Sequence, residues 1–256
     1  MSSSQSDTPQ TATSTSTVKA IAESAKRSDF PIRRSFIQEK SGESNAGPLA
    51  SFVTSHDKTG LLLYFLALTK ASSEPWDVSL HSKVWARALD LESLTEATAR
   101  SRVSKAWSRL VNRQLVRRGG RRKRNMVYLL QREDGSGEPY TRPTSHFVKV
   151  PHTLWTEGPT KEGRWFQVLE LPGLTFLLIA LSNRDSFKLP VERGPDFYGI
   201  SADTLWRGYR ELEAHKLLSV SKELVEAPLT PNGFTQQNIF RLQGSFQQQT
   251  GKQANN

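Results

Sequence analysis

Apolar residues recur at helical and strand spacing in two separate stretches of this chain. In the first stretch, residues 56–70 are apolar at most positions and have the length of a buried helix. Ser79 is expected to cap a second helix, which is followed by a short turn at residues 91–94. Thr95 is expected to cap a third helix that ends near Arg113.

A two-stranded hairpin is expected directly after the third helix. Short strands are predicted near residues 115–118 and 125–131. Between them, Gly119 and Gly120 permit the tight turn of a hairpin tip, and four basic residues follow at 121–124. The first stretch is therefore predicted to form three helices and a hairpin.

The second stretch repeats this plan. Residues 60–69, GLLLYFLALT, align without gaps with residues 173–182, GLTFLLIALS. Further along, one apolar register recurs at a constant offset: Val103, Ala106, Trp107, Leu110 and Leu115 match Leu205, Gly208, Tyr209, Leu212 and Leu217. Two helices in the same register, each followed by strands, indicate an internal duplication.

The remaining segments are polar and define the expected domain organisation. Residues 1–50 are rich in Ser and Thr and are predicted to be a disordered tail, as are residues 247–256. Residues 133–146 are expected to be a turn-rich linker between a first unit at 55–132 and a second at 147–246. The predicted fold class is α+β and helix-rich, with two small tandem domains between disordered ends.

Composition narrows the class of protein. The chain of 256 residues contains no cysteine, which excludes disulfides and thiolate chemistry, and no apolar run long enough to cross a membrane. The polar N-terminus does not match a signal peptide, so a cytoplasmic protein associated with the nucleoid is expected. Neither a phosphate-binding loop nor a nucleophile-elbow motif is present, and the five histidines show no metal-ligand spacing. We therefore expect no enzyme activity and no cofactor, and we infer no small-molecule ligand.

The distribution of basic residues indicates the kind of partner that this protein binds. The chain carries a formal net charge of +10, and the window 97–132 alone holds twelve basic residues and no acid. These residues alternate with apolar positions such as Val103 and Leu110, so the charge belongs to a folded surface. An acid-free basic surface of this kind is typical of proteins that bind polyphosphates. The twelve residues are Arg100, Arg102, Lys105, Arg109, Arg113, Arg117, Arg118, Arg121, Arg122, Lys123, Arg124 and Arg132.

The third helix separates an apolar side from a basic side. At 100° per residue, four basic residues from Arg102 to Arg113 fall within about 80° of one another. Arg102 and Lys105 lie toward the helix N-terminus and are expected to contact bases, whereas Arg109 and Arg113 are expected to contact phosphates. The hairpin tip is expected to contact phosphates or a narrow minor groove. The predicted DNA-binding residues of this unit are Arg100, Ser101, Arg102, Lys105, Arg109, Arg113, Arg121, Arg122, Lys123 and Arg124.

The second unit lacks the charge surplus. Residues 147–246 contain eleven basic and eleven acidic residues. Its counterpart helix is expected to be capped by Ser201, with Arg207 able to pair at i,i+4 with Asp203 or Glu211. Such a helix suits DNA contact or dimerisation equally, and Trp206, off the main apolar stripe, suits an interface. Its predicted DNA contacts are Thr204, Arg207 and Arg210.

The order of three helices and a hairpin resembles winged helix-turn-helix domains in both halves. In the first half, the resemblance rests on residues 79–89, the turn at 91–94, the helix at 95–113 and a wing at 116–130. It implies that the third helix enters the major groove and that the wing touches the flanking DNA. The segments LESLTEATAR (91–100), RLVNRQL (109–115) and DFYGISADT (196–204) are also similar to uncharacterised helix-turn-helix proteins of actinobacterial chromosomes and plasmids.

Two roles compete for a double-stranded DNA-binding protein of this design. We favour a transcriptional regulator that binds a specific site, commonly as a homodimer. The alternative is a plasmid replication initiator that binds repeated origin sites in DNA replication. An RNA-binding or structural adaptor is the third hypothesis.

Overall fold

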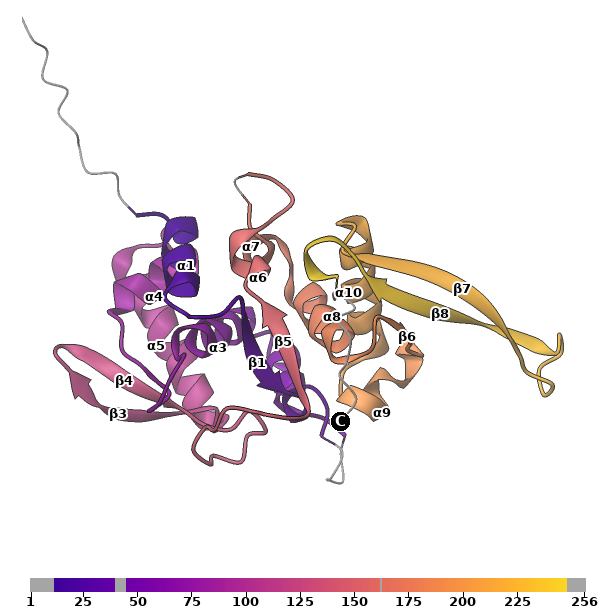
Figure 1. The fold of residues 1–256 in the computed structure, drawn as a ribbon, viewed down its shortest axis with the longest axis horizontal. Helices are drawn as coiled ribbons and strands as arrows, with labels where there is room; N and C mark the ends of the chain where they lie inside the picture. Colours follow the sequence, from indigo (N-terminus) through magenta and orange to yellow (C-terminus); the bar gives the residue numbers. More distant parts are fainter. Residues whose placement is uncertain (1–11, 40–44, 162, 248–256) are drawn as a thin grey trace, which may run out of the picture.

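The computed structural model describes residues 12–39, 45–161 and 163–247 of the chain. The fold of these residues is α+β, as expected, with helices and three small antiparallel sheets, and the hairpins β3–β4 and β7–β8 extend outward on opposite sides (Figure 1). Residues 1–11, 40–44 and 248–256 lie outside the described residues, so the predicted C-terminal tail is described only at Gln247.

Both halves contain the same order of elements. The first half contains α3 (Lys58–Lys70), β2 (Asp77–Val78), α4 (Ser82–Ala88), α5 (Glu96–Asn112), β3 (Val116–Arg122) and β4 (Asn125–Leu130). The second half contains α8 (Leu171–Ser182), β6 (Ser186–Lys188), α9 (Gly194–Tyr198), α10 (Ala202–Ala214), β7 (Leu218–Glu226) and β8 (Phe234–Leu242). The strand order is β2-β4-β3 in one half and β6-β8-β7 in the other, so the repeated order of elements expected from the sequence is present.

A third, two-stranded sheet lies between the halves. β1 (Asp29–Arg33) pairs antiparallel with β5 (Phe147–Pro151), and in Figure 1 the two strands separate the first half from the second. β1 packs against α3, and β5 packs against α8. The shorter helices α1 (Ser14–Glu23), α2 (Pro48–Thr54), α6 (Thr153–Thr156) and α7 (Trp165–Val168) cover this region. The 3-10 turns are Arg34–Phe36, Val191–Arg193 and Gly244–Phe246.

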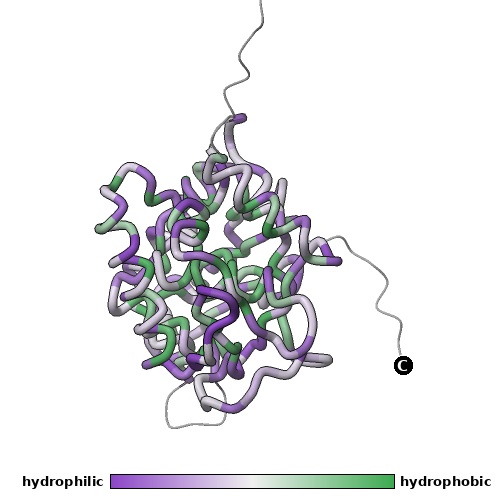
Figure 2. Tube along the Cα trace, turned by 90° about the vertical axis from the view of Figure 1, so that its left-hand side faces the viewer, coloured by the Kyte–Doolittle hydropathy of each residue, from purple (hydrophilic) through white to green (hydrophobic). Residues whose placement is uncertain are grey.

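The two central helices explain why the halves share one core. Residues 60–69 of α3 are all buried, and in α8 every residue except Pro172 is buried. A helix that is apolar on all sides needs packing partners all round, and the central sheet supplies the missing side of each. The buried residues of both halves accordingly form one contiguous cluster, and Figure 2 shows hydrophobic positions in the interior of the trace.

The prediction of a disordered tail over residues 1–50 is wrong for its described part. α1 is capped by Thr13 and buries Val18 and Ile21, while β1 buries Phe30 and Ile32. These apolar residues stand at helical and strand spacing, but the many Ser and Thr residues around them dilute the compositional signal. The segment therefore completes the core instead of trailing from it.

The segment expected to be an acidic linker, 133–146, contains no helix or strand but is anchored in the interior. Glu133 is fully buried and forms an ion pair with Arg33, whose guanidinium also donates to the backbone carbonyl oxygen of Thr141 at 2.7 Å. Burial raises the pKa of the Glu133 carboxyl, and Arg33 offsets only part of that rise. The pair connects the N-terminal strand to the chain that leaves the first hairpin.

Two local predictions in the first half are also corrected. The N-cap of α4 is His81 and not Ser79, because β2 pairs with β4 and keeps the chain extended up to that point. Gly119 and Gly120 do not form the hairpin turn: both lie within β3, where the register shifts between Arg118 and Arg121. Two residues opposite one produce a bulge, which glycine accommodates. The turn itself is at residues 123–124.

Shortening a buried β1 side chain should test whether the N-terminal segment belongs to the core. Ile32 is 0% exposed, so Ile32→Ala should lower the free energy of unfolding by about 2–5 kcal/mol in urea denaturation. Leu229→Ala is the control because Leu229 is fully exposed, and its effect should stay within about 0.5 kcal/mol. Equal unfolding midpoints for the two variants would contradict the packing of β1.

Candidate nucleic-acid interface

The sequence of α5 contains an N-cap residue at its start and a regular apolar face along its length. Thr95 caps it, with the side-chain oxygen accepting from the Thr98 amide at 3.4 Å, and the first turn contains the acidic Glu96. The predicted cap is therefore confirmed. The buried residues of the helix fall at i, i+4, i+7, i+8 and i+11, which is one helix face: Ala99, Val103, Ala106, Trp107 and Leu110.

Stacked aromatic rings hold the hairpin β3–β4 against this helix. The ring of Trp107 lies parallel to that of Tyr128 on β4, with centroids 3.8 Å apart. Its other neighbour is Trp85 of α4, which it meets edge to face at 5.4 Å. Trp85 and Trp107 are each 2% exposed, so both belong to the core. The stack fixes the hairpin relative to α5.

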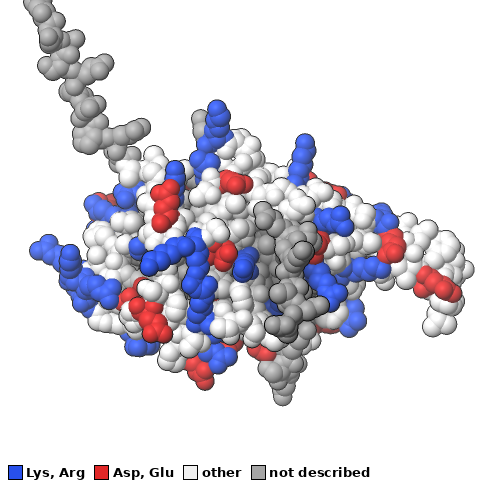
Figure 3. Space-filling view, viewed as in Figure 1, with Lys and Arg blue, Asp and Glu red and all other residues white. Residues whose placement is uncertain are grey.

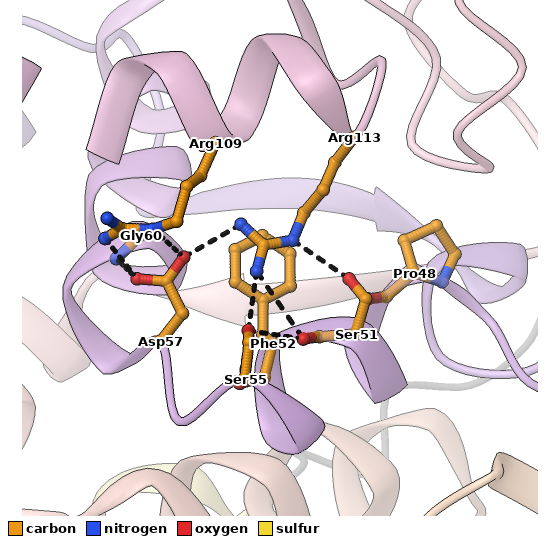
Figure 4. Close-up of polar contacts among 8 residues, drawn as sticks. All are labelled: Pro48, Ser51, Phe52, Ser55, Asp57, Gly60, Arg109 and Arg113. Carbon is orange, nitrogen blue, oxygen red and sulfur yellow. Dashed lines mark hydrogen bonds and ion pairs between the residues drawn. The ribbon is translucent and has the colours of Figure 1, made fainter. Parts of the chain in front are cut away.

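Asp57 ties α5 to the start of α3 (Figure 4). Its carboxylate accepts two hydrogen bonds from Arg109, at 2.7 and 2.6 Å, and a third from Arg113 at 2.8 Å. The same carboxylate caps α3 by accepting from the Gly60 amide at 2.9 Å. Arg113 also lies over the ring of Phe52, 4.2 Å from its centroid. One buried carboxylate thus binds two guanidinium groups and one helix end, and the remaining Arg113 nitrogens donate to Ser51 and Ser55.

These contacts give Arg109 and Arg113 a different role from the predicted one. Both were expected to bind phosphate, but Arg113 is only 13% exposed and Arg109 holds Asp57 through two hydrogen bonds. Their partner lies more than 50 positions upstream, outside the acid-free window. The two residues therefore position the helix and do not belong to its free basic surface.

The electrostatics of the cluster favour an ionised Asp57. Burial on its own would raise the pKa of this carboxyl, since the side chain is 3% exposed. The hydrogen bonds from Arg109, the Gly60 amide and Arg113 outweigh burial and lower the pKa below its ordinary value of 3.8. The carboxylate is consequently charged at neutral pH.

Other basic residues of the window are also paired. Arg100 binds Glu96 at 2.9 Å, and Arg122 binds Asp77 at 2.6 Å. Although the window 97–132 holds no acid, Arg100 has an intrahelical partner, because Glu96 lies one residue outside the window. Arg132 pairs with Asp134 and Glu138 after the hairpin ends.

Six basic side chains of the window 97–132 remain exposed without a hydrogen bond or ion pair to any described residue. We call them the free basic set: Arg102, Lys105, Arg117, Arg121, Lys123 and Arg124. The first two lie on α5 and the others on the hairpin β3–β4, which adjoins it. In Figure 3 the end of this hairpin is a blue projection at the left edge of the molecule. Arg117 belongs to this set although it was not among the predicted site residues.

Between α5 and the hairpin is an open hollow of about 270 Å³. Its floor includes Trp107 and Tyr128, and its rim includes Arg100, Arg121 and Arg124. The exposed side of α5 carries small polar residues, Ser101 and Ser104, next to the hollow and the basic side chains. A helix with small side chains at its centre and cations at its edges can approach a groove closely.

The corresponding surface of the second half is neutralised. Arg207 pairs with Asp203 at 3.0 Å, as predicted, and Arg210 pairs with Glu213 at 3.2 Å. Thr204 is 8% exposed and shares a hydrogen bond with Ser201, the N-cap of α10, so the prediction that it faces outward is wrong. The hydrogen bond to Ser201 holds the Thr204 side chain against the N-terminal end of α10.

No family model matches the chain, and neither a curated protein nor a solved structure matches it. Within the described ranges, no group of three or more His, Asp or Glu side chains could hold a metal ion. None of the helices there is both long and apolar enough to cross a membrane. The arrangement of charge on the fold is therefore the basis for a functional conclusion.

Neutralising Asp57 should destabilise the protein. Asp57→Asn leaves Arg109 and Arg113 without a counter-charge and should lower the free energy of unfolding by about 3 kcal/mol, near the lower limit for a broken buried pair because Arg109 is 40% exposed. Asp203→Asn removes an exposed pair and should cost less than about 0.5 kcal/mol. Equal losses in urea denaturation would contradict the structural role of Asp57.

The stabilisation by Asp57 should depend on pH. Because folding lowers the pKa of this carboxyl, its contribution is fully present above the ordinary value of 3.8 and is lost as pH falls through the folded pKa. The gap in unfolding free energy between wild type and Asp57→Asn should therefore narrow as pH falls below about 4. Urea midpoints at pH 7 and pH 3 measure it, and a gap that stays constant would contradict the assignment.

Proposed function

We propose that this protein binds double-stranded DNA through the exposed side of α5 and the hairpin β3–β4. In this proposal each half is a winged helix-turn-helix unit, and the first unit is the principal DNA-binding module. α5 enters the major groove as the recognition helix, and the hairpin contacts the flanking backbone or minor groove as the wing.

The order of elements supports the winged-helix assignment. In each half a helix, a strand, two helices and two strands follow one another, and the last strand lies between the other two in the sheet. The second of the paired helices carries the exposed polar side, and the hairpin after it adjoins that helix. This is the relation that a recognition helix and a wing require.

The free basic set is the observation that carries the proposal. Its six cations lie on two adjoining elements and have no acid to pair with among the described residues. An ordinary folded surface intersperses both signs of charge, whereas a phosphate backbone supplies the missing anions and releases its own counterions. In this proposal Arg102 and Lys105 contact the groove, while Arg121, Lys123 and Arg124 contact the backbone.

A site-specific transcriptional regulator is the role we favour. The runner-up, a plasmid replication initiator, is supported by the repeated unit, because two tandem modules suit iterated origin sites. The two roles differ in their targets: a regulator protects one site at a promoter, and an initiator protects direct repeats beside an AT-rich segment. DNase I footprinting on the gene's own surroundings distinguishes them. Preference for single-stranded RNA in competition would favour the adaptor hypothesis.

Two variants should separate sequence recognition from backbone attraction. Replacing Arg121, Lys123 and Arg124 by Ala should weaken binding to every DNA sequence and reduce the slope of log K against log salt by about 2 to 3. Replacing Arg102 and Lys105 by Ala should erode preference for the selected site by about 1–3 kcal/mol for each lost base contact. Fluorescence anisotropy across a salt series measures both quantities.

The paired arginines of the second half provide the matched control. Arg207→Ala with Arg210→Ala removes two positive charges that are already neutralised by Asp203 and Glu213. This control should keep the salt slope and the site preference of wild type. A loss as large as that of the hairpin variant would place the interface elsewhere, and unchanged binding in both test variants would overturn the proposal.

A further inference from the structure

The hairpin β7–β8 extends away from the body at the end opposite the basic hairpin (Figure 1). Each of its strands, Leu218–Glu226 and Phe234–Leu242, has nine residues. Toward the tip, Leu224 is 62% exposed and Phe234 is 51% exposed. In Figure 3 this arm is mostly white at its outer end, with only a few charged side chains. Exposed apolar residues on a projecting arm suggest a surface that is covered by a partner.

The arm also has an open backbone edge. Among the described residues, in the sheet order β6-β8-β7, β7 pairs with β8 alone, so its other edge presents backbone N–H and C=O groups to solvent. Natural proteins protect such edges with prolines, bulges or inward charges, or by pairing them with another strand. β7 pairs with β8 in continuous register over its whole length and contains no proline. It is therefore ready to accept a further strand.

The two faces of β7 differ. Glu223 is engaged on one face by Lys188 of β6, at 2.5 Å. Because side chains alternate, Lys222, Leu224 and Glu226 lie on the other face. Phe234 is directly opposite Glu226 in the hairpin and shares that face with Leu224. Neither Lys222 nor Glu226 forms an ion pair with a residue that the structure describes.

We propose that this edge binds the same edge of a second copy of the chain. The two β7 strands run antiparallel about a two-fold axis through Leu224. In this register Lys222 of each copy is opposite Glu226 of the other, which makes two cross-strand ion pairs, and the two Leu224 side chains meet at the axis. Opposite charges on directly opposed strand positions stabilise a pairing, and like charges destabilise it. The two Phe234 rings flank this centre on the same face.

The charge pattern selects this register from its neighbours. An axis through Lys222, Glu223 or Glu226 would place that residue against its own copy, with like charges in direct opposition. An axis through Val225 would leave Lys222 and Glu226 without opposite charges. The strand is thus complementary to itself about Leu224, as an isologous two-fold interface requires.

The pairing does not depend on DNA binding and does not obstruct it. The basic hairpin and α5 lie on the far side of the molecule from the arm, so both copies keep their free basic sets exposed (Figure 1). The segment Lys222–Glu226 is short, and its interface lies at the small end of specific contacts. The dissociation constant of the dimer is therefore expected to be micromolar or higher.

Charge reversal with rescue tests the proposal on the full chain without DNA. Lys222→Glu places glutamate opposite glutamate at both cross-strand positions, and Glu226→Lys places lysine opposite lysine at both. Each single variant should weaken the dimer at least tenfold, and the double variant should restore it because the pairs are exchanged. Sedimentation velocity over a range of protein concentrations measures the dissociation constants. Lys149→Glu, an exposed strand position on β5, is the matched control and should behave as wild type.

Each outcome of this experiment supports or overturns the proposed pairing of the β7 strands. Weakening in both single variants and recovery in the double variant support the proposed register. A wild type that stays monomeric at several hundred micromolar overturns the inference, as does a dimer that resists both single reversals. A dimer lost in the single variants and not recovered in the double overturns the register about Leu224. Because no DNA is present, failure here leaves the proposed DNA interface untouched, and a lack of DNA binding leaves this inference untouched.

Discussion

The orientation of α5 depends on one buried carboxylate. Asp57 caps α3 and at the same time binds Arg109 and Arg113 on successive turns of α5, so the two helices are joined at a fixed point. An unpaired charge at this depth would be strongly unfavourable, and the three partners together satisfy it. Arg102 and Lys105 lie on the same side of the helix as Arg109 and Arg113, one to three turns closer to its N-terminus. There they have no partner among the described residues and remain exposed.

The basic window therefore contains two populations with different physical roles. Arg109 and Arg113 are tied to Asp57, and Arg122 is tied to Asp77, so these charges stabilise the arrangement of the first half. The free basic set repels itself and gains stability only from an anionic partner. A rigid scaffold that holds uncompensated cations in place loses little conformational entropy when phosphates bind. Structural pairs and free charges are in this sense complementary parts of one surface.

Local signals in the sequence predicted the local structure well. The caps Thr95 and Ser201, the hairpins, and the repeated order of elements all depend on neighbouring residues, and the structure has them.

The errors arise where the deciding contact is distant. Asp57 lies more than 50 positions before Arg109 and Arg113, so helical periodicity could not reveal that these arginines are internal. Likewise, Phe30 and Ile32 belong to a strand only because β5 pairs with it more than 100 residues later. The bulge at Gly119 and Gly120 reflects the register with β4, which glycine content alone does not define.

The two halves keep one plan but differ in how they use their surfaces. In the second half, ion pairs neutralise Arg207 and Arg210, so α10 has no surplus of positive charge. Thr204 of the same helix is buried. The hairpin of this half is instead longer, with an open edge and apolar side chains. The central sheet of β1 and β5 packs against both α3 and α8, so the basic surface and the arm are held in one common core. Two copies joined through their arms would hold their α5 helices at a separation set by packed elements and strand length, and not by a flexible linker. If α5 binds DNA as proposed, the spacing between DNA half-sites would follow from the fold itself.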